Sequence, residues 1–352
     1  MTHIAHVVGA RPNFMKVAPV HAALAARGVQ QTLIHTGQHY SEKMSDIFFD
    51  ELQLPRADVN LNVGSGTHAV QTGEVMIRLE PVLDALRPDW LLVYGDVNST
   101  VAAALVCAKL LIPFAHVEAG LRSRDRTMPE EINRIVTDQL ADLLFTPSQD
   151  GNENLAAEGI PGERVRLVGN VMIDTLVRLL PLARQRWAQW NLARFVLVTL
   201  HRPSNVDDVS KLVKLLDVLA GISRELAIVF PIHPRTQESI RRAGFTFPET
   251  VRVVEPLGYL DFIALEERAA FVITDSGGVQ EETTFLGVPC LTMRANTERP
   301  VTVTMGTNTL VGDDLELLRA RLRETPKRGS IPPLWDGRAA ERIADVLLGS
   351  VR

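Results

Sequence analysis

Short apolar runs alternate along this chain with segments that have the hydrophobic period of a helix. We expect the apolar runs to be buried strands, first at residues 4–8, 32–35, 90–94, 114–117, 143–146 and 165–168, and then at residues 195–200, 227–231, 251–254, 271–274 and 289–293. Helical periodicity between them includes residues 14–27, 67–86 and 100–110. Strands that alternate with helices form βαβ units, and such units build parallel sheets.

A helical segment at residues 171–191 divides the strands into two series. The first series ends near Gly169, and the pattern starts again after the segment. The sequence therefore predicts an α/β protein with two Rossmann-like doubly wound domains and a central cleft, at residues 1–169 and 170–336. A C-terminal helix at residues 337–352 could pack on either domain. Ligands bind such sheets outside the carboxyl ends of the strands, so residues just after each strand are the functional candidates.

The composition is that of a globular protein with a large core. A length of 352 residues suggests two domains, and contents of 46% hydrophobic and 22% charged residues are typical of a globular protein. The 37 basic and 42 acidic residues leave a net charge of −5, which argues against nucleic acid as the main partner. Cys107 and Cys290 lie in apolar runs without disulfide or zinc spacing. With no leader-like start and no run of about 18 apolar residues, we expect a cytoplasmic protein that does not enter a membrane.

The apolar run at residues 271–274 ends in an Asp-Ser-Gly-Gly sequence at residues 275–278, after which a helical pattern begins. Small residues between a strand and a helix leave backbone N–H groups exposed, and these groups bind phosphate well. Glu281 and Glu282 follow one turn later, where a carboxylate could accept bonds from ribose hydroxyls. The alternative is a capped helix with an acidic first turn, which is also common.

Two other strands of the second domain end in histidine and arginine. His201 and Arg202 follow one of these strands, and His233 and Arg235 follow the next. Histidine is a common cap residue, so each cluster by itself is a weak signal. Together they predict a local positive charge within an acidic protein, as an anionic ligand requires.

The strand ends of the first domain also carry charged residues. Arg11 and Lys16 lie at the start of a helix, where cations oppose the helix dipole. This placement favours an anionic ligand there, and the alternative is solvated surface charge. Asp96 follows another strand and is either a helix N-cap or a catalytic carboxylate, because the polar residues at 98–100 are equally good caps.

Glu118 directly follows the apolar run at residues 114–117, which is an unusual place for a charge unless it is paired or functional. We therefore interpret Glu118 as a functional residue. Glu130 and Glu131 follow Pro129 at a helix start, where acidic residues are ordinary. Their position alone does not separate a functional role from helix stabilisation.

A glycine-rich stretch at residues 64–69 matches the dinucleotide-binding fingerprint. It follows a weak strand and does not open a clear βαβ unit, so we do not expect NAD to bind there. The nine histidines are dispersed along the chain, and no metal-binding motif is present. The sequence thus indicates neither a metal nor a cofactor.

Six motifs together resemble those of the non-hydrolysing UDP-N-acetylglucosamine 2-epimerases. They are Gly-Ala-Arg-Pro at 9–12, Tyr-Gly-Asp at 94–96, His-Val-Glu-Ala-Gly-Leu-Arg at 116–122, Pro-Glu-Glu-Ile-Asn-Arg at 129–134, Asp-Ser-Gly-Gly-Val-Gln-Glu-Glu at 275–282 and Thr-Glu-Arg-Pro at 297–300. The resemblance implies two domains similar to those of B-type glycosyltransferases, with UDP bound by the second. It also implies a homodimer that interconverts UDP-N-acetylglucosamine and UDP-N-acetylmannosamine without NAD.

The same resemblance implies a mechanism and a set of residues. Such enzymes remove the C2 proton, expel UDP to leave 2-acetamidoglucal, and add UDP back with the opposite configuration at C2. Proton removal requires a positioned carboxylate, and UDP departure requires groups that stabilise the diphosphate charge. The implied catalytic residues are Asp96, Glu118, Glu130 and His201, and the implied substrate-binding residues are Arg11, Lys16, His233, Phe262, Ser276, Gly277, Glu282 and Arg299. Among these, Glu282 would bind the ribose and Phe262 the uracil.

Two features leave regulation and substrate open. Residues 38–46 depart from the extended motif that many bacterial members use for activation by a second substrate molecule. Residues 36–40 and 200–205 also resemble relatives that epimerise UDP-2,3-diacetamido-2,3-dideoxy-glucuronate, whereas residues 297–300 favour UDP-N-acetylglucosamine. A B-type glycosyltransferase is a further alternative.

Overall fold

The computed structural model describes residues 2–38 and 51–350, apart from the side chains of Arg11 and Ser350. It divides into two compact units: Met1–Arg178 with Pro333–Arg352, and Leu179–Pro332. The sequence led us to expect a division near residue 169 and left the packing of the C-terminal helix open. In the structure that helix belongs to the first unit.

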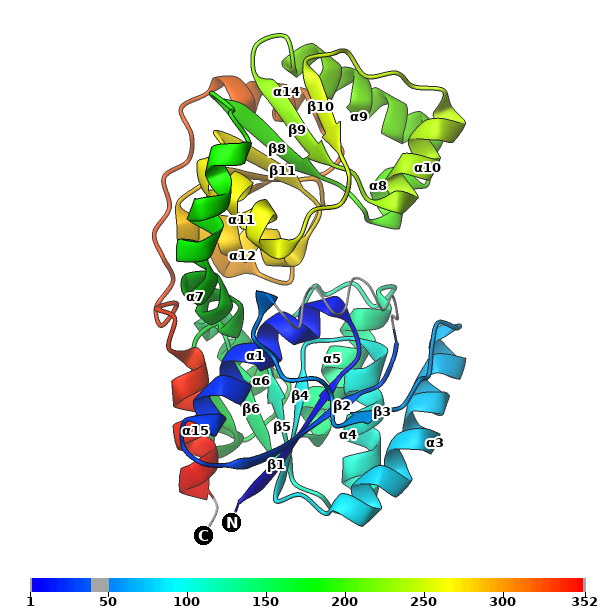
Figure 1. Ribbon diagram of the computed structural model, residues 1–352, viewed down its shortest axis with the longest axis vertical. Helices are drawn as coiled ribbons and strands as arrows, with labels where there is room; N and C mark the ends of the chain where they lie inside the picture. The colour runs from blue at the N-terminus through cyan, green and yellow to red at the C-terminus, as the bar shows by residue number, and fades with distance from the viewer. Residues whose placement is uncertain (1, 39–50, 351–352) are drawn as a thin grey trace. The chain divides into compact units, whose positions relative to one another are not determined.

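Within the described residues, the first unit is built on a parallel sheet with the strand order β3-β2-β1-β4-β5-β6-β7 (Figure 1). The strands are β1 (His3–Val8), β2 (Gln30–His35), β3 (Val59–Asn60), β4 (Trp90–Tyr94), β5 (Phe114–Val117), β6 (Leu143–Thr146) and β7 (Val165–Leu167). The helices are α1 (Arg11–Ala25), α3 (His68–Leu86), α4 (Asn98–Leu110), α5 (Pro129–Leu140), α6 (Gln149–Ala157), the first part of α7 (Val171–Arg186), α15 (Ala339–Ser350) and a 3₁₀ turn at Gly162–Arg164. The expected parallel sheet is therefore confirmed.

The described part of the second unit has a parallel sheet of its own, in the order β10-β9-β8-β11-β12-β13. Its strands are β8 (Phe195–Thr199), β9 (Ala227–Pro231), β10 (Val251–Val254), β11 (Phe271–Thr274), β12 (Cys290–Thr292) and β13 (Asn308–Leu310). Its helices are α8 (Pro203–Val206), α9 (Val209–Ile222), α10 (Pro234–Ala243), α11 (Tyr259–Arg268), α12 (Gly277–Leu286), α13 (Pro300–Thr304), α14 (Leu315–Arg323) and a 3₁₀ turn at Trp187–Gln189. The sequence did not predict β13, which is short and polar.

The apolar runs form the strands because helices cover both faces of each sheet, so the strands are buried on both sides. In the second unit, one face packs Val196 and Phe230 against Leu216 of α9. The opposite face packs Leu197 and Val272 with residues of α11 and α12. Continuous apolar runs, rather than alternating ones, are the sequence signature of such strands.

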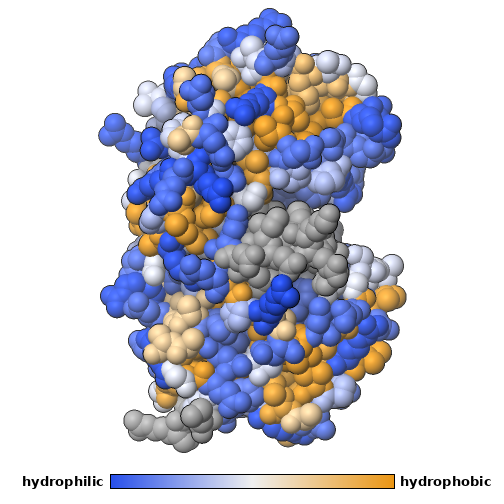
Figure 2. Space-filling view, in the orientation of Figure 1, coloured by the Kyte–Doolittle hydropathy of each residue, from blue (hydrophilic) through white to orange (hydrophobic). Residues whose placement is uncertain are grey.

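The surface carries an apolar patch over part of the first unit. Val70 and Ile77 of α3 are 59% and 67% exposed, and Figure 2 shows apolar side chains in this region. Exposed apolar patches often mark protein–protein contacts. Within the part of the chain that is described, no helix is long and apolar enough to span a membrane.

The C-terminal helix α15 packs beside α1 in the first unit (Figure 1). Arg27, just after α1, forms an ion pair with Asp345 of α15 at 2.6 Å. Asp174 of α7 accepts the backbone N–H groups of Ala339 and Ala340 at 3.1 and 2.7 Å. These N–H groups open α15 and have no partner within the helix, so Asp174 satisfies them and fixes the tail on the first unit.

Asp174 should make the free energy of unfolding depend on pH. Burial raises the pKa of this carboxyl from 3.8 to about 6, although its two backbone bonds oppose the shift. A carboxyl with a raised folded-state pKa contributes stability that is fully present below its unfolded-state pKa and is lost as the pH rises through about 6. We therefore expect the unfolding free energy of wild type, relative to Asp174→Asn, to fall by about 2–3 kcal/mol between about pH 4 and pH 7. Urea unfolding across this range measures the difference, and a constant or rising difference would contradict the assignment.

Candidate functional site

The strand order of each sheet reverses at one point, and the candidate residues gather there. In the first sheet the order reverses between β1 and β4, and in the second between β8 and β11. Ligands of doubly wound sheets bind at such switch points, outside the carboxyl ends of the strands. Asp96 follows β4, and His201 and Asp275 follow β8 and β11. Each unit therefore presents its own set of polar residues, and the two sets are described separately.

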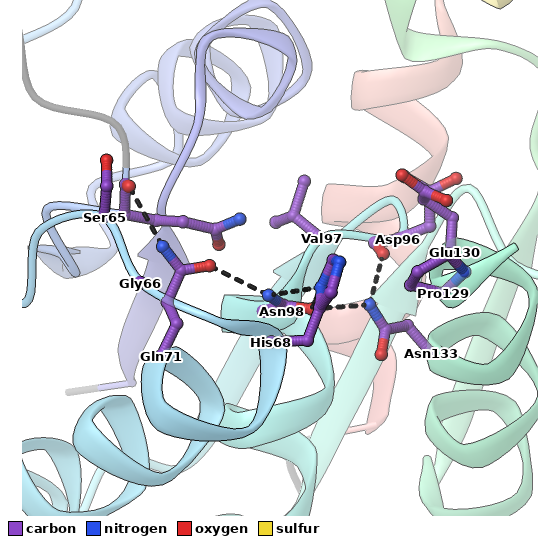
Figure 3. A pocket seen from close by; sticks show the side chains of 11 residues that line it. Ser65, Gly66, His68, Gln71, Asp96, Val97, Asn98, Pro129, Glu130 and Asn133 are labelled. Carbon is purple, nitrogen blue, oxygen red and sulfur yellow. Dashed lines mark hydrogen bonds between the residues drawn. The ribbon is translucent and has the colours of Figure 1, made fainter. Parts of the chain in front are cut away.

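The first unit contains a pocket of about 210 Å³ at this edge of its sheet (Figure 3). Asp96 and Glu130 line one side, and Ser65 and Gln71 line the other. The remaining lining residues are mostly polar and comprise Gln38, Gly66, His68, Val97, Asn98, Pro129 and Asn133. We call this the carboxylate pocket. The glycine-rich stretch at residues 64–69, which the sequence offered only as a dinucleotide motif, contributes Ser65, Gly66 and His68 to it.

Asp96 is held by an arginine rather than used as a helix cap. The N-cap of α4 is Val97, so the capping alternative for Asp96 is wrong. Its carboxylate instead accepts a bond from Arg134 Nη1 at 2.5 Å. Arg134 also donates to Glu131 from Nε and Nη2, at 3.1 and 2.7 Å. Arg134 thus joins the turn after β4 to the first turn of α5 and orients the Asp96 carboxylate.

Glu131 is a structural member of this network. It accepts the backbone N–H groups of Ser123 and Arg124, both at 2.9 Å, in addition to its bonds with Arg134. Burial alone would raise the pKa of Glu131, but the Ser123 and Arg134 bonds lower it below the ordinary value. Glu130 is exposed and lines the pocket. The two adjacent glutamates of α5 therefore face different environments, and only Glu130 is placed to meet a ligand.

Glu118 is buried and forms an ion pair with Lys16 of α1, which is also buried. Glu118 has a φ of 72°, a left-handed conformation that is strained for a glutamate. Gly95 lies against this pair, and a Cβ on Gly95 would be 2.6 Å from Lys16 Nζ and 3.1 Å from Glu118 Oε2. We expected Glu118 to be either paired or functional, and the structure shows that it is paired. Its backbone is also strained, and strained residues are common at active sites.

Some expected residues fall outside what the structure describes. Arg11 is the first residue of α1, but its side chain is not among the described parts of the structure. Residues 39–46, on which the expectation about activation depends, also lie outside the described residues. Gln38 is described: its Oε1 accepts Ser99 N and Ser99 Oγ at 3.1 and 2.7 Å. These bonds fix Gln38 beside the N-terminus of α4.

In the second unit, Asp275 organises the strand ends. It is fully buried and accepts the backbone N–H of Arg202 at 2.9 Å, Asn205 Nδ2 at 3.0 Å and His201 Nδ1 at 2.8 Å. Burial alone would raise the pKa of Asp275, but its bonds with His201 and Asn205 lower it below the ordinary value. An ionised Asp275 requires the proton of His201 to sit on Nδ1, which orients Nε2 away from the carboxylate. The imidazole is 42% exposed, so a ligand can reach it.

The N-terminus of α12 adjoins an arginine. Ser276 is its N-cap, and no side chain caps the helix. A Cβ on Gly277 would collide with Arg299 Nη1, so a side chain there would displace the guanidinium. Arg299 pairs with Glu281 at 2.9 Å and with Glu298. Burial alone would raise the pKa of Glu298, but Arg299 and Arg294 hold it well below its ordinary value.

Three other expected residues also lie in the second unit. Glu282 of α12 is buried and accepts the Tyr259 hydroxyl at 2.5 Å. Phe262 of α11 is partly buried against the core cluster that includes Val279. His233 is the N-cap of α10 and accepts Arg235 N at 3.2 Å, and its ring centroid is 6.1 Å from that of His201. His233 is therefore a capping histidine that also lies beside His201.

The positive charge expected at these strand ends is largely balanced. Arg235 pairs with Asp207 at 2.6 Å, and His201 with Asp275. Glu298 meets the guanidinium groups of Arg294 at 2.7 Å and Arg202 at 3.9 Å. Sequence reasoning did not identify these pairs, because Asp207 with Arg235 and Asp275 with His201 join segments that are distant along the chain. Among the described residues, no group of three side chains suited to metal binding occurs.

Taken together, the two sets can carry out distinct chemistry. The first unit offers carboxylates that can exchange protons, in the carboxylate pocket and beside it. The second offers backbone N–H groups, cations and a carboxylate, which suit a phosphate and a sugar diol.

Comparison with known proteins places the chain among described relatives. A family model described as UDP-N-acetylglucosamine 2-epimerase matches residues 22–348. The UDP-N-acetylglucosamine 2-epimerase of Methanocaldococcus jannaschii is 43% identical over 97% of this chain and 97% of its own. The UDP-2,3-diacetamido-2,3-dideoxy-D-glucuronate 2-epimerase of Pseudomonas aeruginosa is 41% identical over 97% and 98%.

A solved structure extends the likeness to three dimensions. The M. jannaschii UDP-GlcNAc 2-epimerase in complex with UDP-GlcNAc and UDP superimposes with a TM-score of 0.92, at 41% identity over 99% of this chain and 100% of that chain. The expected fold class, two Rossmann-like units of the B-type glycosyltransferase kind, is confirmed.

Proposed function

Since this chain belongs to the UDP-N-acetylglucosamine 2-epimerase family, we propose that it interconverts UDP-N-acetylglucosamine and UDP-N-acetylmannosamine. The reaction removes the C2 proton, eliminates UDP to leave 2-acetamidoglucal, and adds UDP back after the proton returns to the opposite face. The observation that carries the proposal is the gathering of Asp96, Glu118 and Glu130 at neighbouring strand and helix ends of the first unit.

The first unit supplies the proton chemistry. A carboxylate that removes the C2 proton has to be correctly aimed before the substrate binds. Arg134 holds Asp96 in this way, and Lys16 does the same for Glu118. Glu130 lines the same pocket as Asp96, and its side chain is exposed. Two groups are needed, one to take the proton from one face and one to return it to the other, and these three carboxylates are the candidates.

The second unit binds UDP. The N-terminus of α12, with Ser276 and Gly277, offers backbone N–H groups to a phosphate. Arg299 brings a guanidinium to the same place, and the imidazolium form of His201, with Nδ1 bonded to Asp275, would donate from Nε2 as the C1–O bond breaks. We assign the ribose to Glu282 and the uracil to Phe262. Arg11 and Lys16 of the first unit would stabilise the sugar and the diphosphate.

Epimerisation of UDP-2,3-diacetamido-2,3-dideoxy-glucuronate is a second candidate function. The P. aeruginosa relative with that name is nearly as similar to this chain as the M. jannaschii enzyme, at 41% against 43% identity. Both substrates carry an acetamido group at C2 and UDP at C1, so the same carboxylates would serve either reaction.

We further propose a cytoplasmic homodimer. Val70 and Ile77 on α3 provide exposed apolar surface of the kind that subunit contacts cover. Cys107 and Cys290 are buried free thiols, as is usual for proteins in a reducing compartment. Light scattering of the purified protein measures the subunit number, and the mass of a single chain would contradict the dimer.

Glu282 and Asp96 should separate binding from turnover. Glu282→Ala removes a charged acceptor from the ribose diol, which should weaken UDP binding by about 1.5–3 kcal/mol. Glu282→Gln is the matched variant, because it can still bond to Tyr259 but lacks the charge. Asp96→Asn should lower turnover and leave UDP affinity near that of wild type. Calorimetry with UDP tests all three variants, and wild-type affinity in Glu282→Ala would refute the ribose assignment.

The elimination mechanism should leave two chemical traces. Since one carboxylate takes the C2 proton and another returns a proton to the opposite face, the returned proton can come from solvent, and product formed in D₂O should contain deuterium at C2. Because the C1–O bond breaks, small amounts of UDP and 2-acetamidoglucal should accumulate in long incubations. Parallel NMR assays with both UDP-sugars would also identify the preferred substrate. Epimerisation with neither deuterium at C2 nor released UDP would exclude this mechanism, and transfer to an acceptor without C2 exchange would indicate a glycosyltransferase.

A further inference from the structure

His116 of β5 is fully buried, and both of its ring nitrogens meet hydrogen-bond acceptors. Nδ1 is 2.6 Å from Asp138 Oδ1, and Nε2 is 2.8 Å from the carbonyl oxygen of Gly95. A carbonyl oxygen can only accept, so Nε2 must carry a proton. A neutral imidazole would then present a lone pair on Nδ1 toward the carboxyl group of Asp138.

Asp138 is held as a carboxylate by a buried guanidinium. Its second oxygen, Oδ2, accepts Gly120 N at 3.1 Å and Arg122 Nη1 at 2.8 Å, and this adjacent positive charge favours the carboxylate over a carboxylic acid that would donate from Oδ1. Burial alone would raise the pKa of Asp138, but His116 and Arg122 lower it below the ordinary value. Nδ1 of His116 therefore donates to Asp138, and Nε2 donates to Gly95. With a proton on each nitrogen, the ring of His116 is an imidazolium.

The charges around this imidazolium are balanced. Arg122 also pairs with Glu158, at 2.7 Å from Nε and 2.6 Å from Nη2, so two cations meet two carboxylates. The other charged groups near Gly95 are Lys16 and Glu118, which pair with each other. A buried charge is tolerated only when it is paired and hydrogen-bonded in this way.

We propose that His116 and Asp138 form a charged clamp that positions the candidate catalytic carboxylates of the first unit. His116 holds Gly95, which directly precedes Asp96, and Asp138 holds Gly120, which lies two residues after Glu118. Asp138 lies on α5, the helix whose first turn carries Glu130. One pair of side chains thus ties together the three backbone segments that present these carboxylates. His116 and Asp138 are positioning residues, and only their effect on turnover rests on the proposed function.

The protonation state of His116 can be measured without substrate. In NMR spectra of the whole protein with ¹⁵N-labelled histidine, an imidazolium shows two similar ring nitrogens, whereas a neutral ring shows two very different ones. From the two acceptors that its ring nitrogens meet, we expect imidazolium signals that disappear in His116→Asn. His6 is an internal reference: it is equally buried, but burial lowers its pKa to about 3, so it should remain neutral.

Asp138→Asn is the sharpest variant. The introduced amide could donate an N–H to Nδ1 of His116 while its oxygen still accepts from Arg122, so the contacts survive but the second ring proton is no longer required. We expect the His116 signal to change from imidazolium to neutral imidazole in a folded protein. A neutral His116 in wild type would overturn the proposal whatever the epimerase assay shows.

The positioning role needs a kinetic measurement. His116→Asn and His116→Gln each keep one of the two contacts, to Asp138 and to Gly95 respectively, and both should lose the clamp. We expect turnover to fall on the order of 10²-fold in these variants and in Asp138→Asn, with UDP affinity within about twofold of wild type. His3→Gln, near the start of β1, is the matched control and should keep wild-type turnover.

The outcomes are distinguishable. An imidazolium together with unchanged turnover in all three clamp variants would overturn the positioning role. Equal losses of turnover and UDP affinity would also overturn it, because they would indicate a general structural defect. If wild-type protein epimerises neither UDP-sugar, the proposed function fails, and the NMR measurement still decides whether the clamp is charged.

Discussion

The organisation of both units depends on one electrostatic constraint: a charge removed from water must be paired. Parallel sheets covered by helices bury their strands, and several charged residues at the strand ends, such as Glu118 and Asp275, are buried with them. Lys16 with Glu118, Arg134 with Asp96, and His201 with Asp275 all meet this constraint across segments that are distant in sequence. These pairs hold the ends of strands and helices in register with one another.

In the proposed reaction, the pairs of the first unit would prepare the carboxylates for chemistry. A carboxylate beside a guanidinium or ammonium group keeps one orientation, so it would need little reorganisation when the C2 proton is removed. The second unit uses the constraint differently. Arg299 and Arg294 share Glu298, which keeps Arg299 in place beside the N-terminus of α12. An arriving diphosphate would meet cations that are already fixed.

Much of the fold could be predicted because its signals are local. Buried parallel strands read as continuous apolar runs, and all the expected strand runs correspond to strands in the structure. Glu118 and the Asp-Ser-Gly-Gly turn also stood out from their neighbours alone, since a charge after an apolar run and small residues before a helix both need an explanation. Each of these features can be recognised from one short stretch of sequence.

The rest of the site could not be predicted because it depends on pairing between distant segments. Nothing near Arg134 reveals that it reaches Asp96, and nothing near Arg235 shows that Asp207 balances its charge. The stretch at residues 64–69 joins the carboxylate pocket only because α3 begins there. Asp174 binds the C-terminal helix from a distant part of the chain, which is why sequence alone left that helix unplaced.

The most direct test of the pairing constraint removes a partner cation without touching a carboxylate. Arg134→Met keeps much of the side-chain volume but leaves Asp96 without its guanidinium. Arg78→Met is the matched control, because Arg78 is 41% exposed and pairs with Glu74 on the surface of α3. We expect the rate of UDP-N-acetylmannosamine formation to fall at least about tenfold in Arg134→Met, with UDP affinity unchanged, and to stay at the wild-type value in Arg78→Met. Equal rates in the two variants would show that the ion pair with Arg134 does not prepare Asp96 for catalysis.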